Sequence, residues 1–572
     1  YRGRPVQPTD TFTLALNNYR ANGGGGYAML AEAPVVRRID REVRKLLAEE
    51  IVRRGTIRPE AYFRRNWRLV PPELAARALE EMVGPVPVAR ARKEKRLRVW
   101  AINDFHGNLE PLRPRWADSA RVGGIAALGG YVAQERAAAG AVPLLVLDAG
   151  DVMQGTALSN LTWGQATVAA YNRLGIAAAA LGNHEFDWGL DTLRTRIAEA
   201  RFPWLAANVS VAGADTAPSW LRRAVTVTLP ACRPETSTCD TIRVGIVGLA
   251  TTSTPRTTRP SHVRGLVFSD PATALDRWVP SLRAAGADFV VAVAHAGGRC
   301  DARGCEGEIF DAIRRARARP DLVISGHTHT VFAADVEGTL VVQQGEYGTR
   351  YSLVELVRDS VDSVRVRLLR QPVTYTDSVA PDTALARMAA EIEARLGARL
   401  REVVTEVDRP WTRQGDEYAL GRLIADAQRA AVDAEAAIMN NGGIRIDLGP
   451  GPVTYADLYR LQPFQNTLVV LTLSGAELRR ALELGLRGAR PNLHVSGLRV
   501  WYDPAAPPGQ RVRAVRRGNG RPLADDDTLR VVVNDFLAEG GDGFDVFAQA
   551  RRREVTGWVD LDALIEIGRA SC

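Results

Sequence analysis

Cysteine and long apolar runs are scarce in this chain, and each shortage argues against a class of protein. The 572 residues contain five cysteines, and neither of the two local pairs has the spacing of a zinc ribbon. No apolar run approaches the roughly 18 residues that a membrane helix requires, so we expect no membrane span in this sequence. The hydrophobic content of 46% and charged content of 24% are ordinary for globular proteins. A chain of this length is expected to form two or three domains with large cores.

The net charge of +8 comes mostly from arginines scattered through the sequence. A nucleic-acid-binding face would need a basic stripe with interleaved aromatic residues. The only dense basic run is Ala91–Arg98, which we interpret as a solvated linker. We therefore expect no nucleic-acid partner.

The cysteines suggest where the protein works. Cys232 and Cys239 bracket one polar loop and Cys300 and Cys305 another, so each pair could close a short disulfide, the alternative being free surface thiols. Local disulfides favour an exported, oxidising setting, so we expect a periplasmic, secreted or cell-surface protein. The sequence begins with Tyr1 and shows no signal peptide, so we expect a fragment or a processed product.

Five short segments that follow apolar runs carry metal-binding side chains. The apolar runs are Leu97–Ile102, Leu144–Leu147, Ala177–Leu181, Phe289–Val293 and Leu322–Ile324. The side chains that follow them are Asp104, His106, Asp151, Asn183, His184, His295, His327 and His329. Five of the seven histidines lie in these segments, which chance placement does not explain. Because α/β sheets place their sites at the carboxyl ends of strands, we expect a metal site there for Zn²⁺, Mn²⁺ or Mg²⁺.

Alternating strand and helix patterns from Arg98 to about Arg370 predict a stacked α/β domain. Pro372–Pro381 is a polar, proline-bounded linker, and Asp382 is a plausible N-cap for a connecting helix up to Arg401. A second α/β region is expected from about Val403 to Ile567.

An internal repeat links the two ends of the chain. Asn17–Tyr27 aligns with Asn534–Phe544 at a constant offset, and each copy follows an apolar segment expected to be a strand, Phe12–Leu16 and Leu529–Val533. This repeat predicts a tandem protein whose first copy is present only as its tail. Gly25 stands where the second copy has Asp542, so we expect the first copy to be inert.

These motifs, in this order, resemble the 5′-nucleotidase family. The resemblance implies a four-layer α/β/β/α calcineurin-like metallophosphoesterase domain followed by an α/β 5′-nucleotidase C-terminal domain. The implied divisions are 1–97, a partial C-terminal domain of an upstream repeat plus the basic linker; 98–371, the metallophosphoesterase domain; 372–402, the linker and connecting helix; and 403–572, the substrate-binding domain. Residues 1 to about 72 resemble the end of a 2′,3′-cyclic-nucleotide 2′-phosphodiesterase-type domain, as in a truncated bacterial trifunctional nucleotide phosphoesterase.

The resemblance also implies roles for individual residues. Asp104, His106, Asp151 and His329 would hold one divalent metal ion, and Asp151, Asn183, His295 and His327 a second. Such ions, about 3.5–4 Å apart, can hold a phosphoryl oxygen and lower the pKa of a bound water. His184 and Asp187 would form a catalytic dyad in which the carboxylate orients the ring and favours its protonated form.

The resemblance places substrate recognition in the second region. The implied substrate-binding residues are Asn440 and Arg445 of the Asn-Gly-Gly-Ile-Arg loop, Phe464 and Phe536 as a base clamp, and Asp542 on the ribose hydroxyls. Two departures put phosphate recognition by one segment in doubt. Arg413 is also an implied substrate-binding residue, although it is displaced by one position from the family pattern. Arg422 stands where an asparagine is usual and could partly substitute for it.

The resemblance implies an enzyme that hydrolyses nucleoside 5′-monophosphates by in-line attack of a metal-bound hydroxide. Because all members share the same phosphorus chemistry, a nucleotide-sugar pyrophosphatase and a 2′,3′-cyclic-nucleotide phosphodiesterase remain as alternatives. A non-catalytic nucleotide-binding module is the alternative of another class. It would be expected to lose ligands or the dyad, and this sequence keeps both.

Overall fold

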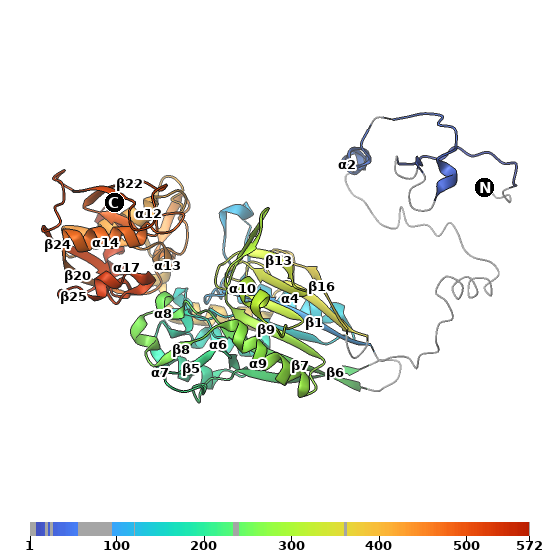
Figure 1. Ribbon diagram of the computed structural model, residues 1–572, viewed down its shortest axis with the longest axis horizontal. Coiled ribbons are helices and arrows are strands. Elements are labelled where there is room, and N and C mark those ends of the chain that lie inside the picture. Colours follow the sequence, from blue (N-terminus) through green and yellow to red (C-terminus); the bar gives the residue numbers. More distant parts are fainter. Residues whose placement is uncertain are drawn as a thin grey trace. The chain divides into compact units, whose positions relative to one another are not determined.

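The computed structural model describes residues 7–17, 21–22, 27–39, 41–54, 94–118, 120–232, 239–359 and 363–570 (Figure 1). The chain forms two compact units, Tyr1–Ala91 and Arg92–Cys572.

The described part of the first unit contains the short helix η1 (Ala28–Leu30) and α2 (Val43–Arg54). A strand was expected at residues 12–16, but the structure assigns none there, and the apolar side chains are exposed, with Leu14 at 62%. Gly25 and the end of the segment up to about residue 72, on which the resemblance to an upstream domain rests, lie outside the described residues.

Two six-stranded sheets form the first part of the second unit. The first has the order β16-β15-β1-β2-β3-β4. Its strands are β1 (Lys95–Ile102), β2 (Leu144–Asp148), β3 (Ala178–Ala180), β4 (Trp204–Leu205), β15 (Ser352–Arg358) and β16 (Val364–Arg370). Strands β1 to β4 are parallel, and β15 joins β1 in antiparallel register. β1 begins at Lys95, within the basic run that was expected to be a linker, because Leu97 is fully buried.

The second sheet has the order β13-β14-β12-β9-β7-β6. Its strands are β6 (Ala224–Cys232), β7 (Cys239–Ala250), β9 (Phe289–His295), β12 (Leu322–Ser325), β13 (Val331–Val336) and β14 (Thr339–Gln344). Strands β7, β9, β12 and β14 are parallel. A small pair, β5 (Val209–Val211) with β8 (Leu266–Phe268), lies outside both sheets. All five strands predicted to precede metal-binding side chains are confirmed.

Alternation along the strands explains the layers. In β1, Leu97 and Val99 belong to a core shared with Val244 of β7 and Val291 of β9, so the two sheets pack face to face. The alternate residues Trp100 and Ile102 face the other way and pack with helices. Helices α4 (Ile125–Ala139) and α6 (Gln165–Leu174) cover the first sheet, and α9 (Pro271–Ala284) and α10 (Glu308–Arg315) cover the second. The predicted α/β class and four-layer arrangement are confirmed.

Shorter elements complete this domain. They are η3 (Arg115–Ala117), α5 (Ala157–Asn160), η4 (His184–Phe186), α7 (Gly189–Glu199), α8 (Thr254–Thr257) and η5 (Pro260–Val263).

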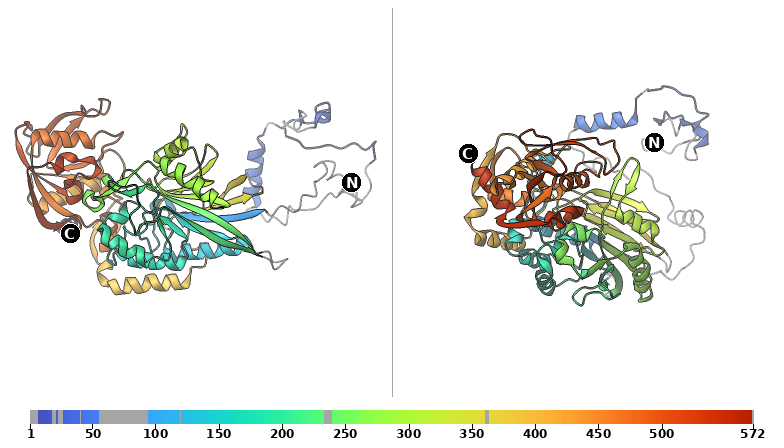
Figure 2. Two further views of the ribbon diagram at one scale, coloured as in Figure 1. Left: turned by 60° about the horizontal axis from the view of Figure 1, so that its bottom comes forward. Right: turned by 60° about the vertical axis from the view of Figure 1, so that its left-hand side comes forward.

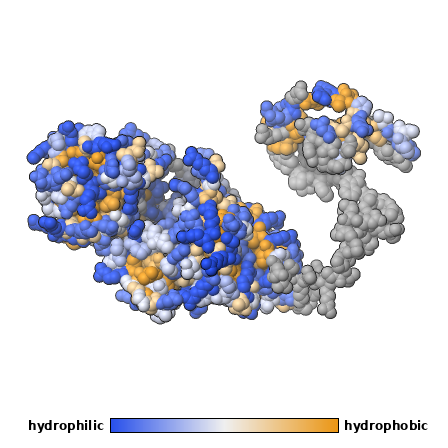
Figure 3. Space-filling model, in the orientation of Figure 1, coloured by the Kyte–Doolittle hydropathy of each residue, from blue (hydrophilic) through white to orange (hydrophobic). Residues whose placement is uncertain are grey.

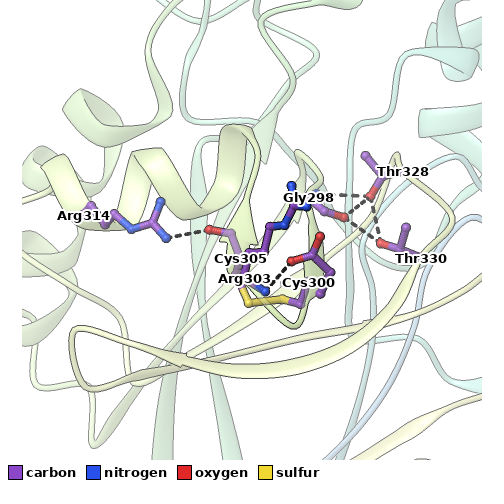
Figure 4. Close-up of a disulfide and its surroundings, with 8 residues drawn as sticks. Gly298, Cys300, Arg303, Cys305, Arg314, Thr328 and Thr330 are labelled. Atoms are coloured by element: carbon purple, nitrogen blue, oxygen red, sulfur yellow. Dashed lines mark hydrogen bonds between the residues drawn. A yellow bond between two sulfur atoms is a disulfide. The ribbon is translucent and has the colours of Figure 1, made fainter. Parts of the chain in front are cut away.

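A disulfide hairpin lies next to one of the strand ends. Cys300 and Cys305 are joined by a disulfide between β10 (Arg299–Asp301) and β11 (Gly304–Glu306) (Figure 4). The hydroxyls of Thr328 and Thr330 both donate to the carbonyl of Gly298, at 2.8 and 2.6 Å, just before the hairpin. The hairpin therefore supports the loop that carries His327 and His329. Cys239 is disulfide-bonded too.

The connecting helix is shorter than expected. Asp382 caps α11 (Thr383–Leu396), its Oδ1 accepting from the backbone nitrogens of Ala384 and Leu385, both at 2.9 Å. The helix ends at Gly397, where φ is 84°, and η6 (Ala398–Arg401) follows separately. Helix α11 lies along α4 (Figure 2), and a side chain at Gly130 would collide with the carbonyl of Ala380.

The C-terminal region is built on a mixed sheet of order β21-β18-β24-β20-β25. Its strands are β18 (Ala436–Met439), β20 (Thr467–Ser474), β21 (His494–Ser496), β24 (Thr528–Asn534) and β25 (Arg552–Val559). Two two-stranded sheets accompany it, β17 (Val403–Val407) with β19 (Gly451–Thr454) and β22 (Leu498–Tyr502) with β23 (Val512–Arg517). The helices are α12 (Ala419–Ala431), η7 (Asn441–Gly443), α13 (Tyr455–Leu461), α14 (Gly475–Gly485), α15 (Asp535–Ala538), η8 (Gly541–Gly543), α16 (Asp545–Ala548) and α17 (Asp560–Ala570).

The visible face of the described chain is largely hydrophilic, with apolar residues scattered over it (Figure 3). Within the described residues, no helix combines the length and apolar character needed to cross a membrane.

Candidate functional site

The strand ends bring the predicted metal-binding side chains together as two groups. Asp104, His106 and His329 offer ligand atoms that all lie within 4.8 Å of one another, and so do Asp151, His295 and His327. These residues follow β1, β2, β9 and β12, whose carboxyl ends meet at one edge of the sheet pair.

Hydrogen bonds at the back of the rings leave acceptor atoms facing one another. His295 Nδ1 lies 2.9 Å from the carbonyl of Ala149, which can only accept, so this nitrogen carries the proton. His295 Nε2 then lies 3.0 Å from Asp151 Oδ2 and 3.1 Å from Asn183 Oδ1. Three acceptors that converge in this way fit a divalent cation.

The other group repeats this pattern. His106 Nδ1 donates to the carbonyl of Gln154 at 2.7 Å, and its Nε2 lies 3.1 Å from His329 Nε2. His329 Nε2 is also 3.2 Å from Asp104 Oδ1. Asp151 Oδ2 lies 3.8 Å from His106 Nε2, so one carboxylate faces both groups.

The charges in the site suit metal binding. Burial lowers the pKa of His327 to about 3, and burial holds the pKa of His106 well below its usual range, so both rings are neutral, as a metal ligand must be. Although burial alone would raise the pKa of Asp151 and of Asp104, nearby histidines outweigh it and lower both, that of Asp104 to about 2. Burial opposes a charge on His295, yet Asp151 raises its pKa to about 10. Asp104 and Asp151 therefore supply negative charge at the point where these side chains meet.

The backbone is held in unusual conformations to aim these side chains. Twelve non-glycine residues of the described chain have positive φ, and five of them are predicted metal ligands: Asp104, His106, Asp151, His327 and His329. Such strain is tolerated mainly where function requires it. Gly182 makes room, because a side chain there would meet Asp151 Oδ1 at 2.2 Å.

Glu185 fixes two of the loops, a role that sequence reasoning did not assign. Its carboxylate accepts from the backbone nitrogens of Gly182, Asp151, Val152 and Met153, at 2.7 to 3.3 Å. One buried side chain thus ties the loop after β2 to the loop after β3. Glu346 was also missed, and its carboxylate pairs with Nδ1 of His329.

His184 and Asp187 meet as expected. His184 Nδ1 lies 2.7 Å from Asp187 Oδ2, so the imidazole donates to the carboxylate. The His184 ring also lies against Phe464, with ring centroids 5.4 Å apart.

A cavity of about 320 Å³ joins the two domains of this unit. From the first domain, its walls include Asp151, Asn183, His184, Asp187, His327 and His329. From the C-terminal region, its walls include Asn440, Arg445, Phe464, Phe536 and Asp542. Asn440 Nδ2 donates to Asp542 Oδ2 at 2.7 Å, and Arg445 Nη2 lies 3.3 Å from His106 Nε2.

Arg413 does not join this set. It bonds through its backbone nitrogen and Nε to Asp447 Oδ1, at 2.9 and 3.2 Å, and is not among the residues that line the cavity. Arg422 is exposed on α12 and does not line the cavity either.

Comparisons with known proteins agree with this architecture. The calcineurin-like phosphoesterase family matches residues 97–331, and the 5′-nucleotidase C-terminal domain family matches residues 399–549. The crystal structure of a 5′-nucleotidase precursor from Thermus thermophilus is similar with a TM-score of 0.73 and 30% identity, covering 83% of this chain and 96% of that one.

Two curated relatives are longer than this chain. The trifunctional nucleotide phosphoesterase protein YfkN of Bacillus subtilis is 27% identical over 99% of this chain and 42% of its own length. The cell wall protein Lmo0130 of Listeria monocytogenes is 28% identical over 79% of this chain and 64% of its own length. This chain therefore spans less than two thirds of either relative. Its match to both domain families, and to the Thermus structure over nearly all of that protein, shows that the chain belongs to the 5′-nucleotidase family.

Proposed function

We propose that this chain hydrolyses nucleoside 5′-monophosphates to a nucleoside and phosphate. The observation that carries the proposal is the shared cavity, in which the two metal-binding groups and the dyad face Phe464, Phe536 and Asp542. Its volume of about 320 Å³ suits a small ligand. A phosphate ester that also carries an aromatic base would contact both walls at once, with its phosphate at the metal-binding groups and its base at Phe464 and Phe536.

The C-terminal wall would recognise the nucleoside. The base stacks between Phe464 and Phe536, and this contact tolerates any base because every base has a π-face. The ribose hydroxyls bond to Asp542, whose carboxylate Asn440 holds in place at 2.7 Å. Arg445 carries positive charge toward the phosphate from beside His106.

The first domain would hold two divalent metal ions, which polarise the phosphoryl oxygens and lower the pKa of the attacking water. Asp104, His106, Asp151 and His329 form one ligand set, and Asp151, Asn183, His295 and His327 form the other. Asn183 is suited to this role because its Nδ2 donates to the carbonyl of Thr257, which leaves Oδ1 directed at His295.

The dyad would handle the leaving group. With Nδ1 bonded to Asp187, His184 presents Nε2 to the cavity and, when protonated, delivers a proton to the departing nucleoside oxygen. Asn183, His184 and Arg445 together offset charge on the phosphoryl oxygens.

The proposal extends to organisation and location. Residues 98–371 supply catalysis, 372–402 connect the two domains, and 403–572 supply recognition. The Cys300–Cys305 disulfide and the similarity to a cell wall protein support a cell-surface, periplasmic or secreted location.

The test measures phosphate release from AMP, a nucleotide sugar and 2′,3′-cyclic AMP after chelation and add-back of Mn²⁺, Zn²⁺ or Mg²⁺. We expect AMP to give the highest kcat/KM, with activity lost on chelation and regained with at least one metal. His184→Ala, purified in parallel, controls for contaminating phosphatases. A preference for the nucleotide sugar or the cyclic nucleotide would replace the proposed substrate, and tight AMP binding without turnover would indicate a binding module.

A further inference from the structure

One short segment touches both the catalytic loop and the C-terminal region. This coupling segment, residues 257–262, runs from the end of α8 into η5. Sequence reasoning gave it no role, because its threonines, arginine and serine match no motif. Its contacts nevertheless connect the dyad to the nucleotide-recognition wall.

On one side the coupling segment holds the loop that carries the dyad. Thr258 Oγ1 donates to Asp187 Oδ1 at 2.9 Å. The carbonyl of Thr257 accepts from Asn183 Nδ2, and His262 Nδ1 donates to the carbonyl of Phe186 at 2.9 Å. Three residues of the catalytic loop are thus fixed by one neighbouring segment.

On the other side the segment is anchored to α15. Arg259 Nη2 pairs with Asp535 Oδ2 at 2.5 Å, and Ser261 Oγ donates to Glu539 Oε2 at 2.6 Å. Asp535 directly precedes Phe536, which lines the cavity. The position of Thr258 is therefore set from both domains.

The Thr258 hydroxyl completes a hydrogen-bonded chain. Asp187 Oδ2 accepts from His184 and its Oδ1 accepts from Thr258, so both carboxylate oxygens are used and the carboxylate plane is fixed. Thr258 is 1% exposed, and its backbone nitrogen donates to the carbonyl of Thr254 at 3.1 Å. A fixed carboxylate fixes the imidazole that it bonds, so the hydroxyl sets the direction of His184 Nε2.

We propose that Thr258 is a positioning residue for the reaction, acting through Asp187 on His184, and that Arg259 and Ser261 hold it in place. The inference rests on the proposed function only in taking His184 as the proton donor. Thr258 is thus a third member of the hydrogen-bonded network that His184 and Asp187 form.

The test compares three variants. Thr258→Val keeps the shape and removes the hydroxyl, and we expect kcat to fall roughly 10-fold, with KM within about twofold of the wild type. Thr258→Ser retains the hydroxyl and should recover most of kcat. Thr254→Val is the matched control, because Thr254 is equally buried on α8 but its hydroxyl bonds to the carbonyl of Thr251, so its kcat should not change.

A second measurement separates positioning from general damage. In a His184→Ala background, adding Thr258→Val should cost nothing further, because the group that Thr258 positions is already gone. Additive losses, or equal losses in Thr258→Val and Thr254→Val, would overturn the inference.

The kinetics are measured with AMP and with ribose 5-phosphate, an alkyl phosphate without a base whose leaving oxygen needs a proton as that of AMP does. If the proposed nucleotide specificity is wrong, AMP will be a poor substrate. The effect of Thr258→Val on kcat can then still be measured with the other ester. If Thr258→Val does not fold, the folded Thr258→Ser variant provides the test. A large loss of kcat in that variant would overturn the inference.

Discussion

Replacing Phe536 with leucine removes a π-face from the cavity while keeping an apolar side chain of similar bulk. The ring lines the cavity and is only partly buried against the C-terminal core, so the substitution leaves the fold intact. It sits tightly against its own glycine turn, since a side chain at Gly541 would meet the ring at 2.4 Å. The aromatic face is therefore held ready for a base.

Stacking on one aromatic side chain contributes about 1–3 kcal/mol per base. Since each 1.36 kcal/mol is a factor of ten, Phe536→Leu should raise KM for AMP roughly 5- to 150-fold with little change in kcat. The Ki of adenosine as a competitive inhibitor should rise by the same factor, which confirms that binding is what changes.

Ribose 5-phosphate provides the control because it has the phosphate and sugar but no base. Its kcat/KM should be the same in the wild type and in Phe536→Leu. An equal loss with both substrates would refute the base-clamp assignment and would mean that the substitution disturbs the cavity as a whole.

Four further predictions concern the metal site, the dyad and the disulfide. Asp151→Asn keeps size but loses the charge that faces both metal groups, so activity should be abolished and metal analysis should find fewer than two ions per chain; two ions and near-normal turnover would disprove the bridge. His184→Ala should keep both metals and lose roughly 10²–10⁴ in kcat, and loss of metal instead would make His184 a ligand. Chelation should lower the melting temperature, because each site filled at 100 times its Kd adds about 2.7 kcal/mol; a melting temperature that ignores metal would contradict both groups. Replacing Cys300 and Cys305 with serine should cost about 2 kcal/mol in the free energy of unfolding, and a variant as stable as the wild type would show that the hairpin does not need its disulfide.

The metal-binding side chains could be predicted from the sequence because each follows a strand that the sequence also reveals. Parallel strands bring their carboxyl ends to one edge, so Asp104, Asp151 and His295 converge although they are far apart along the chain. These strands could be found for the same reason, since fully buried strands are continuous apolar runs, and their bounds were predicted to within two residues. The sequence pattern identifies each strand and the side chain at its end, and the fold brings these side chains together.

Other features depended on contacts that no local pattern records. Nothing in the sequence distinguishes Thr258 from other threonines, but the fold places its hydroxyl 2.9 Å from Asp187. The pairing of Arg413 with Asp447 is likewise a contact that the sequence does not reveal. Residues 12–16 show the reverse error: the apolar pattern is that of a strand, but no neighbouring strand is present in the described residues. In each case the missing information was the identity of a distant partner.

The site contains two kinds of buried acidic residue, and their different roles explain how the fold maintains the site. Burial would raise the pKa of Asp104 and Asp151, but the histidines beside them keep it low and keep both carboxylates charged within the two groups. Asp148 and Glu185 lie behind them, where burial raises the pKa of each to about 8, and they accept from backbone nitrogens and from the Tyr171 hydroxyl. Asp104 and Asp151 place negative charge where a cation would bind. Asp148 and Glu185 hold the strained loops that carry these two residues. A substitution at Glu185 would therefore act on the metal site although Glu185 supplies no ligand, because the loops after β2 and β3 would lose their shared anchor.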